Sequence, residues 1–502
     1  MKNKIFRLDV LKNKILKLKK QNKKIVICHG VFDVLHFGHI NYLNEAKKNG
    51  DILIVSLTSD KYVNKGFNRP YFSQEIRAHS LASLECVNYV YVNNDKTAEK
   101  IIKIIKPNFY VKGPDYIKKK DINLEKEKKA IQEAGGKIIF TKGISYSSSK
   151  IINDQLNNYN KSQLKFLKEL KNTISPKNID DYFKKFSNTN ILIIGEIIID
   201  EYIFCDAIGK SGKEPVMVNK TLYSEKYAGG VLTVSNHLSS ICKSIKILSY
   251  IGDKDNDLKF INKCLNKNTS LDYIKKNNSP TIKKTRLVDN YTKNKITGLY
   301  NINDIELNKE EENKFIKKLN NLIKKFDQVV VVDYGHGLLT KKIISLIEKK
   351  SKFLSVNAQI NSLNNNYNSI LKYSKANYVC LHEGELRYAF RERYKKIEDV
   401  ILLLKDKIKS KTITITKGKE GSLSLSNNKF FYCPAFANEV VDRIGAGDTL
   451  LSYTSICQLH YVPNNLSLLI GNIAAANFIN KIGTGHKINK IDLINSIKHL
   501  LK

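Results

Sequence analysis

Residues 24–39 read KIVICHGVFDVLHFGH and join a short apolar segment to the start of a periodic one. The β-branched run KIVIC (24–28) is typical of a buried strand, and INYLNEAKK (40–48) has the periodicity of an amphipathic helix. A strand that feeds a helix through such a loop indicates a parallel α/β sheet, whose ligands bind beyond the carboxyl ends of the strands. The loop HGVFDVLHFGH (29–39) is therefore a candidate ligand site.

The two histidines of this loop are suited to hold a phosphate. His36 and His39 lie three residues apart, so on a helix they project to one side. Imidazole N–H groups donate to phosphate oxygens, a helix N-terminus adds partial positive charge, and Gly38 leaves room for the phosphate to approach the backbone. The alternative is an ordinary pair of partly exposed histidines; the strand before them and the GVFD segment favour the phosphate site.

The chain alternates strand and helix in two series. In the first, the predicted strands are residues 24–28, 52–57, 89–92, 109–111 and 137–140. In the second, they begin with ILIIG (191–195) and continue through SIKILSYIG, QVVVVDYG, NYVCL and TITIT. The polar, strand-free stretch between them indicates a helical linker. We therefore predict two α/β domains, at 1–153 and 188–502, joined by a linker at 154–187.

Composition limits the remaining function classes. The 502 residues carry a net charge of +37. This charge is compatible with nucleic-acid binding, but lysines recur along the whole chain with no aromatic-interleaved basic block, so we expect no specific nucleic acid. Eight scattered cysteines without metal spacing predict reduced thiols. With no signal peptide or long apolar run, the expected location is the cytoplasm, without membrane contact.

The first series resembles the nucleotidyltransferase family that includes glycerol-3-phosphate cytidylyltransferase and the adenylyltransferase of ADP-heptose synthesis. The resemblance covers residues 24–152 and includes the H-x-G-H signature His36-Phe37-Gly38-His39, KPNFYVKGPDY (106–116) and ISYSSSKII (144–152). It implies attack of a sugar-phosphate oxygen on the α-phosphorus of a nucleoside triphosphate, with release of pyrophosphate. The nucleotide-binding residues it implies are Gly30, Phe32, His36, Gly38, His39, Lys65, Arg77, Ser147 and Ser148, with His36 and His39 catalytic.

A second site is predicted at DRIGAGDTL (442–450). Gly445, Ala446 and Gly447 precede an apolar helix, and successive backbone N–H groups at a helix N-terminus form an anion hole. Asp448 at its edge can take a proton from an attacking hydroxyl. A helix N-cap would explain Asp448 alone, but not the Gly-Ala-Gly run as well. The pattern favours phosphoryl transfer from ATP to an alcohol.

This second series, about residues 190–485, resembles the ribokinase-like sugar kinases of the PfkB family. The resemblance implies Asp448 as the base and places Lys417 and Gly418, with Gly445, Ala446 and Gly447, around ATP. It assigns Asp200, Gly229, Gly230 and Thr233 to the sugar, and Glu385 to a Mg²⁺-bound water. KEPVMV (213–218) resembles the small lid of the heptose-phosphate kinases.

The chain also departs from the PfkB pattern near the sugar. Thr233 replaces an Asn, His336 a Lys and His382 an Asn, SVNAQ (355–359) replaces a usual Asp-Pro-Lys segment, and Arg443-Ile444 stands where a Thr is common. The catalytic loop is intact, so kinase activity is expected. The sugar is left open, and so is a kinase-like half without activity.

Together the two resemblances imply an α/β protein with a Rossmann-like nucleotidyltransferase domain and a ribokinase-like domain with a small β lid, in the reverse of the usual order of bifunctional heptose enzymes. We expect Mg²⁺, ATP and, as the alternative at the first site, CTP, with sugar phosphates as the other substrates. In the heptose pathway a separate phosphatase acts between the two steps. The alternatives are a cytidylyltransferase for another sugar or polyol phosphate, and a basic nucleic-acid-binding protein. A homodimer is left open.

Overall fold

The computed structural model describes residues 4–63, 70–116, 122–141, 159–255, 257–364, 367–437, 440–483 and 487–501. The chain divides into two compact units, Met1–Asn158 and Tyr159–Lys502, which are described separately. Within the described residues, no helix combines the length and apolar character that a membrane span requires. All eight cysteines are free thiols in the structure.

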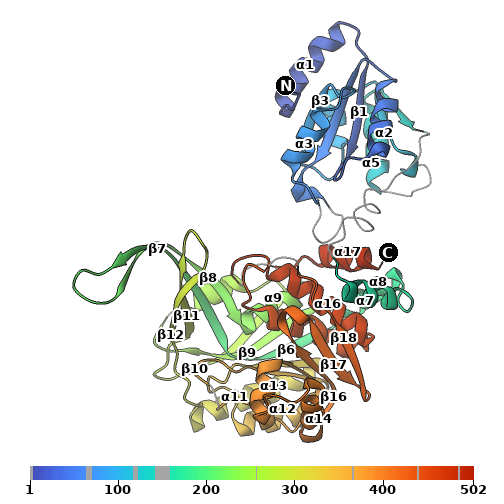
Figure 1. The fold of residues 1–502 in the computed structure, drawn as a ribbon. Helices are drawn as coiled ribbons and strands as arrows, with labels where there is room; N and C mark the ends of the chain where they lie inside the picture. The colour runs from blue at the N-terminus through green and yellow to red at the C-terminus, as the bar shows by residue number, and fades with distance from the viewer. Residues whose placement is uncertain are drawn as a thin grey trace. The chain divides into compact units, whose positions relative to one another are not determined.

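The first unit is built on a parallel five-stranded sheet with the order β3-β2-β1-β4-β5 (Figure 1). Its strands are β1 (Ile25–Gly30), β2 (Ile52–Thr58), β3 (Tyr89–Asn93), β4 (Phe109–Lys112) and β5 (Lys137–Phe140). Its helices are α1 (Leu8–Lys20), α2 (Phe37–Lys47), α3 (Gln74–Ala82), α4 (Glu99–Ile105) and α5 (Ile122–Glu133). All five predicted strands are confirmed, and the strand order reverses between β1 and β4, where an open α/β sheet binds its ligand.

The two faces of this sheet have separate cores. Val26 and Cys28 of β1 point to one face and join Leu43 of α2. Ile25 and Ile27 point to the other face, where they meet apolar residues of α1, α4 and α5. Apolar side chains on both faces explain why these strands read as continuous apolar runs instead of alternating ones.

The second unit contains a nine-stranded sheet with the order β10-β9-β6-β13-β14-β15-β16-β17-β18. Its strands are β6 (Asn190–Gly195), β9 (Ser244–Gly252), β10 (Thr269–Lys276), β13 (Gln328–Asp333), β14 (Leu354–Ala358), β15 (Lys375–His382), β16 (Lys409–Thr416), β17 (Ser422–Ser426) and β18 (Lys429–Cys433). The sheet is parallel from β10 to β16, while β17 and β18 are antiparallel.

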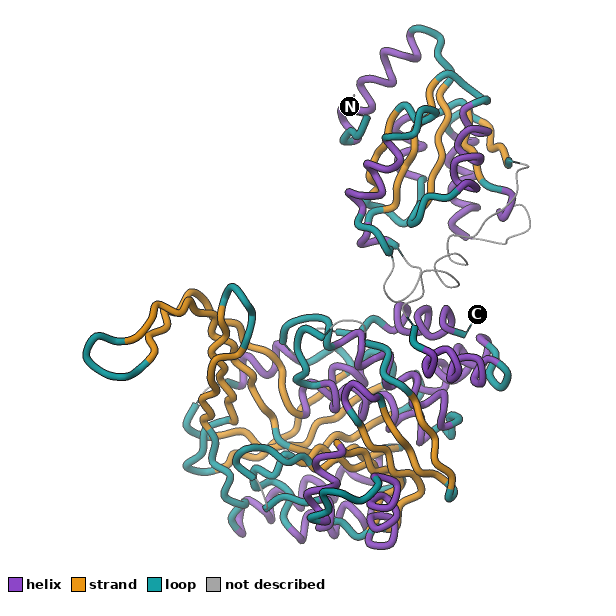
Figure 2. Tube along the Cα trace, viewed as in Figure 1, coloured by secondary structure: helices purple, strands orange, loops and turns teal. Residues whose placement is uncertain are grey.

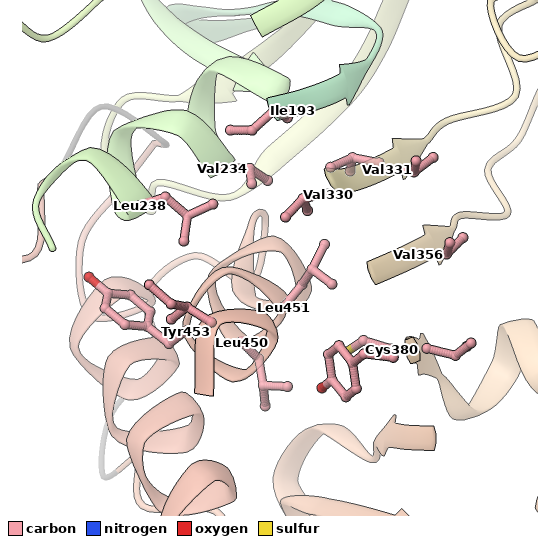
Figure 3. Close-up of a cluster of buried hydrophobic side chains, with 14 of the residues drawn as sticks. Ile193, Val234, Leu238, Val330, Val331, Val356, Cys380, Leu450, Leu451 and Tyr453 are labelled. Atoms are coloured by element: carbon pink, nitrogen blue, oxygen red, sulfur yellow. The ribbon is translucent and has the colours of Figure 1, made fainter. Parts of the chain in front are cut away.

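Helices cover both faces of this sheet. They are α7 (Lys161–Lys171), α8 (Pro176–Phe186), α9 (Val231–Ser239), α10 (Leu258–Cys264), α11 (Lys309–Leu322), α12 (Lys341–Lys350), α13 (Glu383–Phe390), α14 (Ile397–Lys407), α15 (Ala446–Leu459), α16 (Asn464–Phe478) and α17 (Lys490–Leu500). Figure 3 shows the side chains of α9 and α15, among them Val234 and Leu451, beside Ile193 of β6 and Val330 of β13. This core fixes the N-terminal end of α15, which carries the Gly-Ala-Gly turn.

A separate four-stranded sheet, which we call the lid, has the order β12-β11-β7-β8. Its strands are β7 (Ile197–Lys210), β8 (Met217–Gly230), β11 (Ile282–Asp289) and β12 (Lys295–Asn301). The β7–β8 hairpin extends away from the body of the second unit (Figure 2). The small β lid expected from the sequence is therefore present, and KEPVMV (213–218) covers the turn of this hairpin and the start of β8.

The predicted linker is helical, but its described part belongs to the second unit. Residues 154–158 lie outside the described residues. Helix α7 packs through Phe166 and Leu170, and α8 through Phe183 and Phe186, into the main core of the second unit. The charged faces of these helices suggested a solvated connector, but their apolar residues recur with helical spacing and form a buried stripe.

Candidate active sites

The H-x-G-H segment lies at the N-terminus of α2, beyond the carboxyl end of β1. His36 is extended and caps the helix, and Gly38 lies in its first turn. The rings of His36 and His39 are stacked, with their centroids 3.9 Å apart and their planes 20° from parallel. The ring of Phe32 meets His39 edge-on at 5.3 Å. Both imidazoles are therefore held together at the sheet edge where the sequence predicts a phosphate site.

The turn before this helix needs particular residues. Phe32 is buried and has a left-handed backbone with φ 47°. A Cβ on Gly30 would lie 3.1 Å from the Phe32 ring, so a larger residue would crowd it. The buried carboxylate of Asp33 accepts hydrogen bonds from the backbone N–H groups of Tyr71 and Phe72. The GVFD segment thus fixes the turn that presents the histidines.

Arg77, which the resemblance assigns to the triphosphate, is held by protein groups. Its side chain is buried in α3 and donates to the carbonyl oxygens of Phe72, Val31 and Thr58. It also forms an ion pair with Asp60. In this structure its donors face protein groups, and its contact with a triphosphate stays a prediction. Lys65, Ser147 and Ser148 lie outside the described residues.

In the second unit, Gly445, Ala446 and Gly447 form the turn into α15. Gly445 caps the helix with φ 81°, a conformation that favours glycine. A Cβ built on Gly447 would meet no atom within 4 Å, so the backbone there borders open space. The first N–H groups of α15 have no partner within their own helix, so this turn can serve as an anion hole.

Asp448 lies in the first turn of α15 and is only 8% exposed. The amide Nε2 of Gln359 donates to its Oδ1 at 2.7 Å. Burial raises the pKa of Asp448 to about 6, and the Gln359 hydrogen bond offsets part of that rise. A carboxylate poised close to neutral pH is suited to accept a proton from a hydroxyl group.

The predicted sugar residues gather at the base of the lid. Asp200 of β7 is buried and paired with Arg286 of β11. A Cβ on Gly229 would lie 2.4 Å from the Asp200 carboxylate, and Gly230 has φ +57°. The Thr233 hydroxyl donates to the carbonyl of Ala228 at 2.7 Å, so its one donor is already engaged. The negative charge of Asp200 also raises the pKa of Asp448, so the two carboxylates lie near enough to interact electrostatically.

The other predicted residues lie at the ends of β15 and β16. Glu385 accepts hydrogen bonds from the backbone N–H groups of His382 and Ile360, and burial raises its pKa to about 7. Lys417 pairs with Glu420 across a 3-10 turn that begins at Gly418, where φ is +56°. Among the described residues, no cluster of three or more His, Cys, Asp or Glu side chains could hold a metal ion.

Several residues of this site were not singled out from the sequence. The charge of buried Lys284 of β11 acts on both Asp200 and Asp448. Glu196 accepts from the N–H groups of Tyr334 and His336, and burial raises its pKa to about 7. His336 is fully buried, and neither ring nitrogen has a hydrogen-bond partner among the described residues. Gln359 is the last residue of SVNAQ, a segment that already differed from the PfkB pattern in the sequence. Lys284 and Arg286 could not be told apart by sequence from the other members of the 85 basic residues.

Comparisons with known proteins agree with this division into two sites. Residues 27–154 match the cytidylyltransferase-like family, and residues 188–490 match the pfkB family of carbohydrate kinases. Bifunctional protein HldE of Campylobacter fetus is 44% identical over 129 residues, which are 25% of this chain and 28% of that protein. Bifunctional protein HldE of Campylobacter jejuni is 29% identical over 297 residues, 59% of this chain and 62% of that one.

Both alignments cover less than two-thirds of the relatives' own lengths. A solved structure of phosphofructokinase-2 from Escherichia coli superimposes with a TM-score of 0.51 at 12% identity, covering 62% of this chain and all of that one, and it supports the fold of the second unit. With its intact Gly-Ala-Gly-Asp turn and its lid, the chain belongs to the pfkB family of carbohydrate kinases and carries a cytidylyltransferase-like domain before the kinase domain.

Proposed function

We propose that the chain is a bifunctional enzyme of nucleotide-sugar synthesis. Its second unit phosphorylates a sugar, preferably a heptose phosphate at the anomeric hydroxyl, with ATP. Its first unit transfers a nucleotidyl group, preferably AMP, from a nucleoside triphosphate to a sugar-1-phosphate. The relatives named HldE support the combination of the two activities, and the sugar and the nucleotide are part of the proposal.

In the kinase step, Asp448 takes the proton of the acceptor hydroxyl while the hydroxyl oxygen attacks the γ-phosphorus of ATP. The bond from that phosphorus to the bridging oxygen breaks, and ADP leaves. Backbone N–H groups of 445–447 donate to the oxygens of the transferred phosphoryl group as their charge changes. Mg²⁺ would be carried mainly by the triphosphate and would neutralise its charge, with Glu385 as the nearby carboxylate that could hold its water.

In the nucleotidyl transfer, an oxygen of the sugar phosphate attacks the α-phosphorus of the triphosphate, and pyrophosphate leaves. This nucleophile is already ionised, so the step needs positioning and charge stabilisation more than a base. His36 and His39, stacked at the N-terminus of α2, donate to the α-phosphate oxygens.

One observation carries the proposal: each unit presents groups suited to hold a phosphate, with stacked imidazoles in the first and a Gly-Ala-Gly turn beside a buried carboxylate in the second. The test is a screen of the purified chain. It should release ADP from ATP with heptose 7-phosphate, and pyrophosphate from ATP or CTP with heptose 1-phosphate. If no sugar-1-phosphate and triphosphate pair yields pyrophosphate, the first half of the proposal is wrong.

A second candidate is a cytidylyltransferase for another sugar or polyol phosphate, with a weak or inactive kinase half. The observation that favours it is the altered kinase site, where the ring of His336 is buried and the SVNAQ segment brings the amide of Gln359 to Asp448. CTP-dependent pyrophosphate release without ADP release on any sugar would support this candidate.

A further inference from the structure

The carboxylate of Asp442 joins the lid to the turn that forms the anion hole. Asp442 lies three residues before Gly445 and is 5% exposed. Its oxygens accept four hydrogen bonds. Two come from backbone N–H groups in the body of the second unit, from Ile444 at 3.1 Å and from Gly483 at 3.2 Å.

The other two hydrogen bonds come from the lid. The Tyr202 hydroxyl of β7 donates to Oδ2 at 2.8 Å, and the Lys295 ammonium of β12 donates to Oδ1 at 2.6 Å. Burial opposes the charged form of Asp442, yet Lys295 and the other donors hold its pKa below the usual value. The carboxylate therefore stays ionised and can hold a charge-assisted contact between the lid and the turn.

Apolar packing accompanies these polar contacts. Tyr202, Phe204 and Val288 of the lid form a small core of their own, against which Ile444 packs. Nearby, a Cβ on Gly483 would lie 2.6 Å from the ring of Tyr227 in β8. This packing gives a physical reason for Ile444 in place of the usual Thr, because the apolar side chain covers the base of the lid.

The same lid residues lead to the sugar site. Asp200 precedes Tyr202 by two residues on β7, and its partner Arg286 lies over the Tyr202 ring at 5.7 Å. The ammonium of Lys295 lies over the same ring at 5.5 Å. The contacts therefore run without a break from Asp200 and Arg286, through Tyr202 and Lys295, to Asp442 and the turn.

We propose that Lys295 and Tyr202 are positioning residues for phosphoryl transfer. Through their hydrogen bonds to Asp442, these two lid residues hold the anion-hole turn in place. This inference rests on the proposed kinase function. A sugar that orders the Asp200–Arg286 end of the lid thereby fixes the backbone N–H groups of 445–447 against the phosphoryl group. The lid then contributes to kcat as well as to sugar binding.

The test compares K295M, K295R and Y202F with the matched control K220M, an exposed lid lysine of β8 for which no ion pair is seen in the described part of the chain. With ATP and heptose 7-phosphate, K295M should lower kcat for ADP release by about tenfold or more, because a displaced catalytic group costs up to about 10²-fold. KM for the sugar phosphate should change less than kcat. Y202F should show a smaller loss in kcat, and K295R should restore most of the rate, while K220M keeps the wild-type values.

A second readout separates positioning from a merely structural ion pair. Hydrogen–deuterium exchange of the amides of 443–449, with β,γ-methylene-ATP bound, should be faster in K295M than in wild type and K220M. Wild-type kcat in K295M overturns the inference, and so does a loss of kcat with unchanged exchange of the turn. If the wild-type chain phosphorylates no sugar, the proposed function fails, and the exchange comparison still decides whether the lid orders the turn.

Discussion

The two proposed phosphate sites of this chain take their hydrogen-bond donors from different parts of the polypeptide. In the first unit, two stacked and partly exposed imidazoles present N–H donors from side chains at the start of α2. In the second, donors come from the backbone of the turn into α15, and the buried carboxylate of Asp448 lies beside them. The difference fits the nucleophiles of the two proposed reactions: an ionised phosphate needs only charge stabilisation, whereas a sugar hydroxyl must lose a proton.

The largest effect is expected for D448N. An amide keeps the shape of the side chain but cannot take the proton, so kcat for ADP release should fall by about 10²–10⁴-fold, the usual contribution of a general base. Pyrophosphate release by the first unit should not change. Both rates are measured on the same preparation, by coupled ADP and pyrophosphate assays.

The matched control is D181N, which removes an exposed carboxylate on α8. This variant should leave both activities at wild-type values. If D448N kept its full rate of ADP release, Asp448 would not be the base, and the contrast between the two sites would lose its main support.

A comparable loss in the other unit is expected for H36A. Removing one donor to a phosphate oxygen costs about 10²–10³-fold in kcat when the donor stabilises charge in the transition state. The loss should appear in pyrophosphate release and not in ADP release. H79A, which removes an exposed histidine on α3, is the control. Equal activity of H36A and H79A would mean that the stacked pair does not contact the nucleotide.

Arg77 tests whether the first unit uses a further side-chain donor besides the two histidines. It is predicted to bind phosphate, but its guanidinium is buried and bonded to protein groups. R77M leaves the carbonyl groups of Val31 and Thr58 without their donors, so the first unit should lose about 1.5–3 kcal/mol of stability, the usual contribution of hydrogen bonds that involve a charged group. Urea denaturation of the full chain, followed by fluorescence of a label in the first unit, measures this. If Arg77 binds the triphosphate instead, R77M will raise the KM for the triphosphate while its unfolding midpoint stays unchanged.

The elements of the fold were largely predictable, because their apolar runs are long and regular. ILIVSL (52–57) and SIKILSYIG (244–252) read as buried strands, and both are strands. Helices α7 and α8 were predicted as helices but assigned to a linker, since the sequence does not show what a helix packs against. For the same reason Lys284, Arg286 and Lys295 were missed: ordinary lysines and arginines become site residues only where the lid brings them beside Asp200, Asp448 and Asp442.

The smallest expected effect is the pH dependence of the two rates. It distinguishes the two sites without removing a catalytic group. Since burial raises the pKa of Asp448 to about 6, the base is ionised above that pH and protonated below it. The rate of ADP release should therefore fall about tenfold for each pH unit below about 6. Pyrophosphate release should not show this fall at low pH, because Asp448 takes no part in that reaction.

The Q359M variant tests whether the fall in ADP release reports on Asp448. In Q359M the Asp448 carboxylate loses a hydrogen bond that favours its charged form, so its pKa should rise and the rate should begin to fall at a higher pH. A kinase profile that is flat from pH 5 to 8, or unmoved in Q359M, would show that a group other than Asp448 accepts the proton.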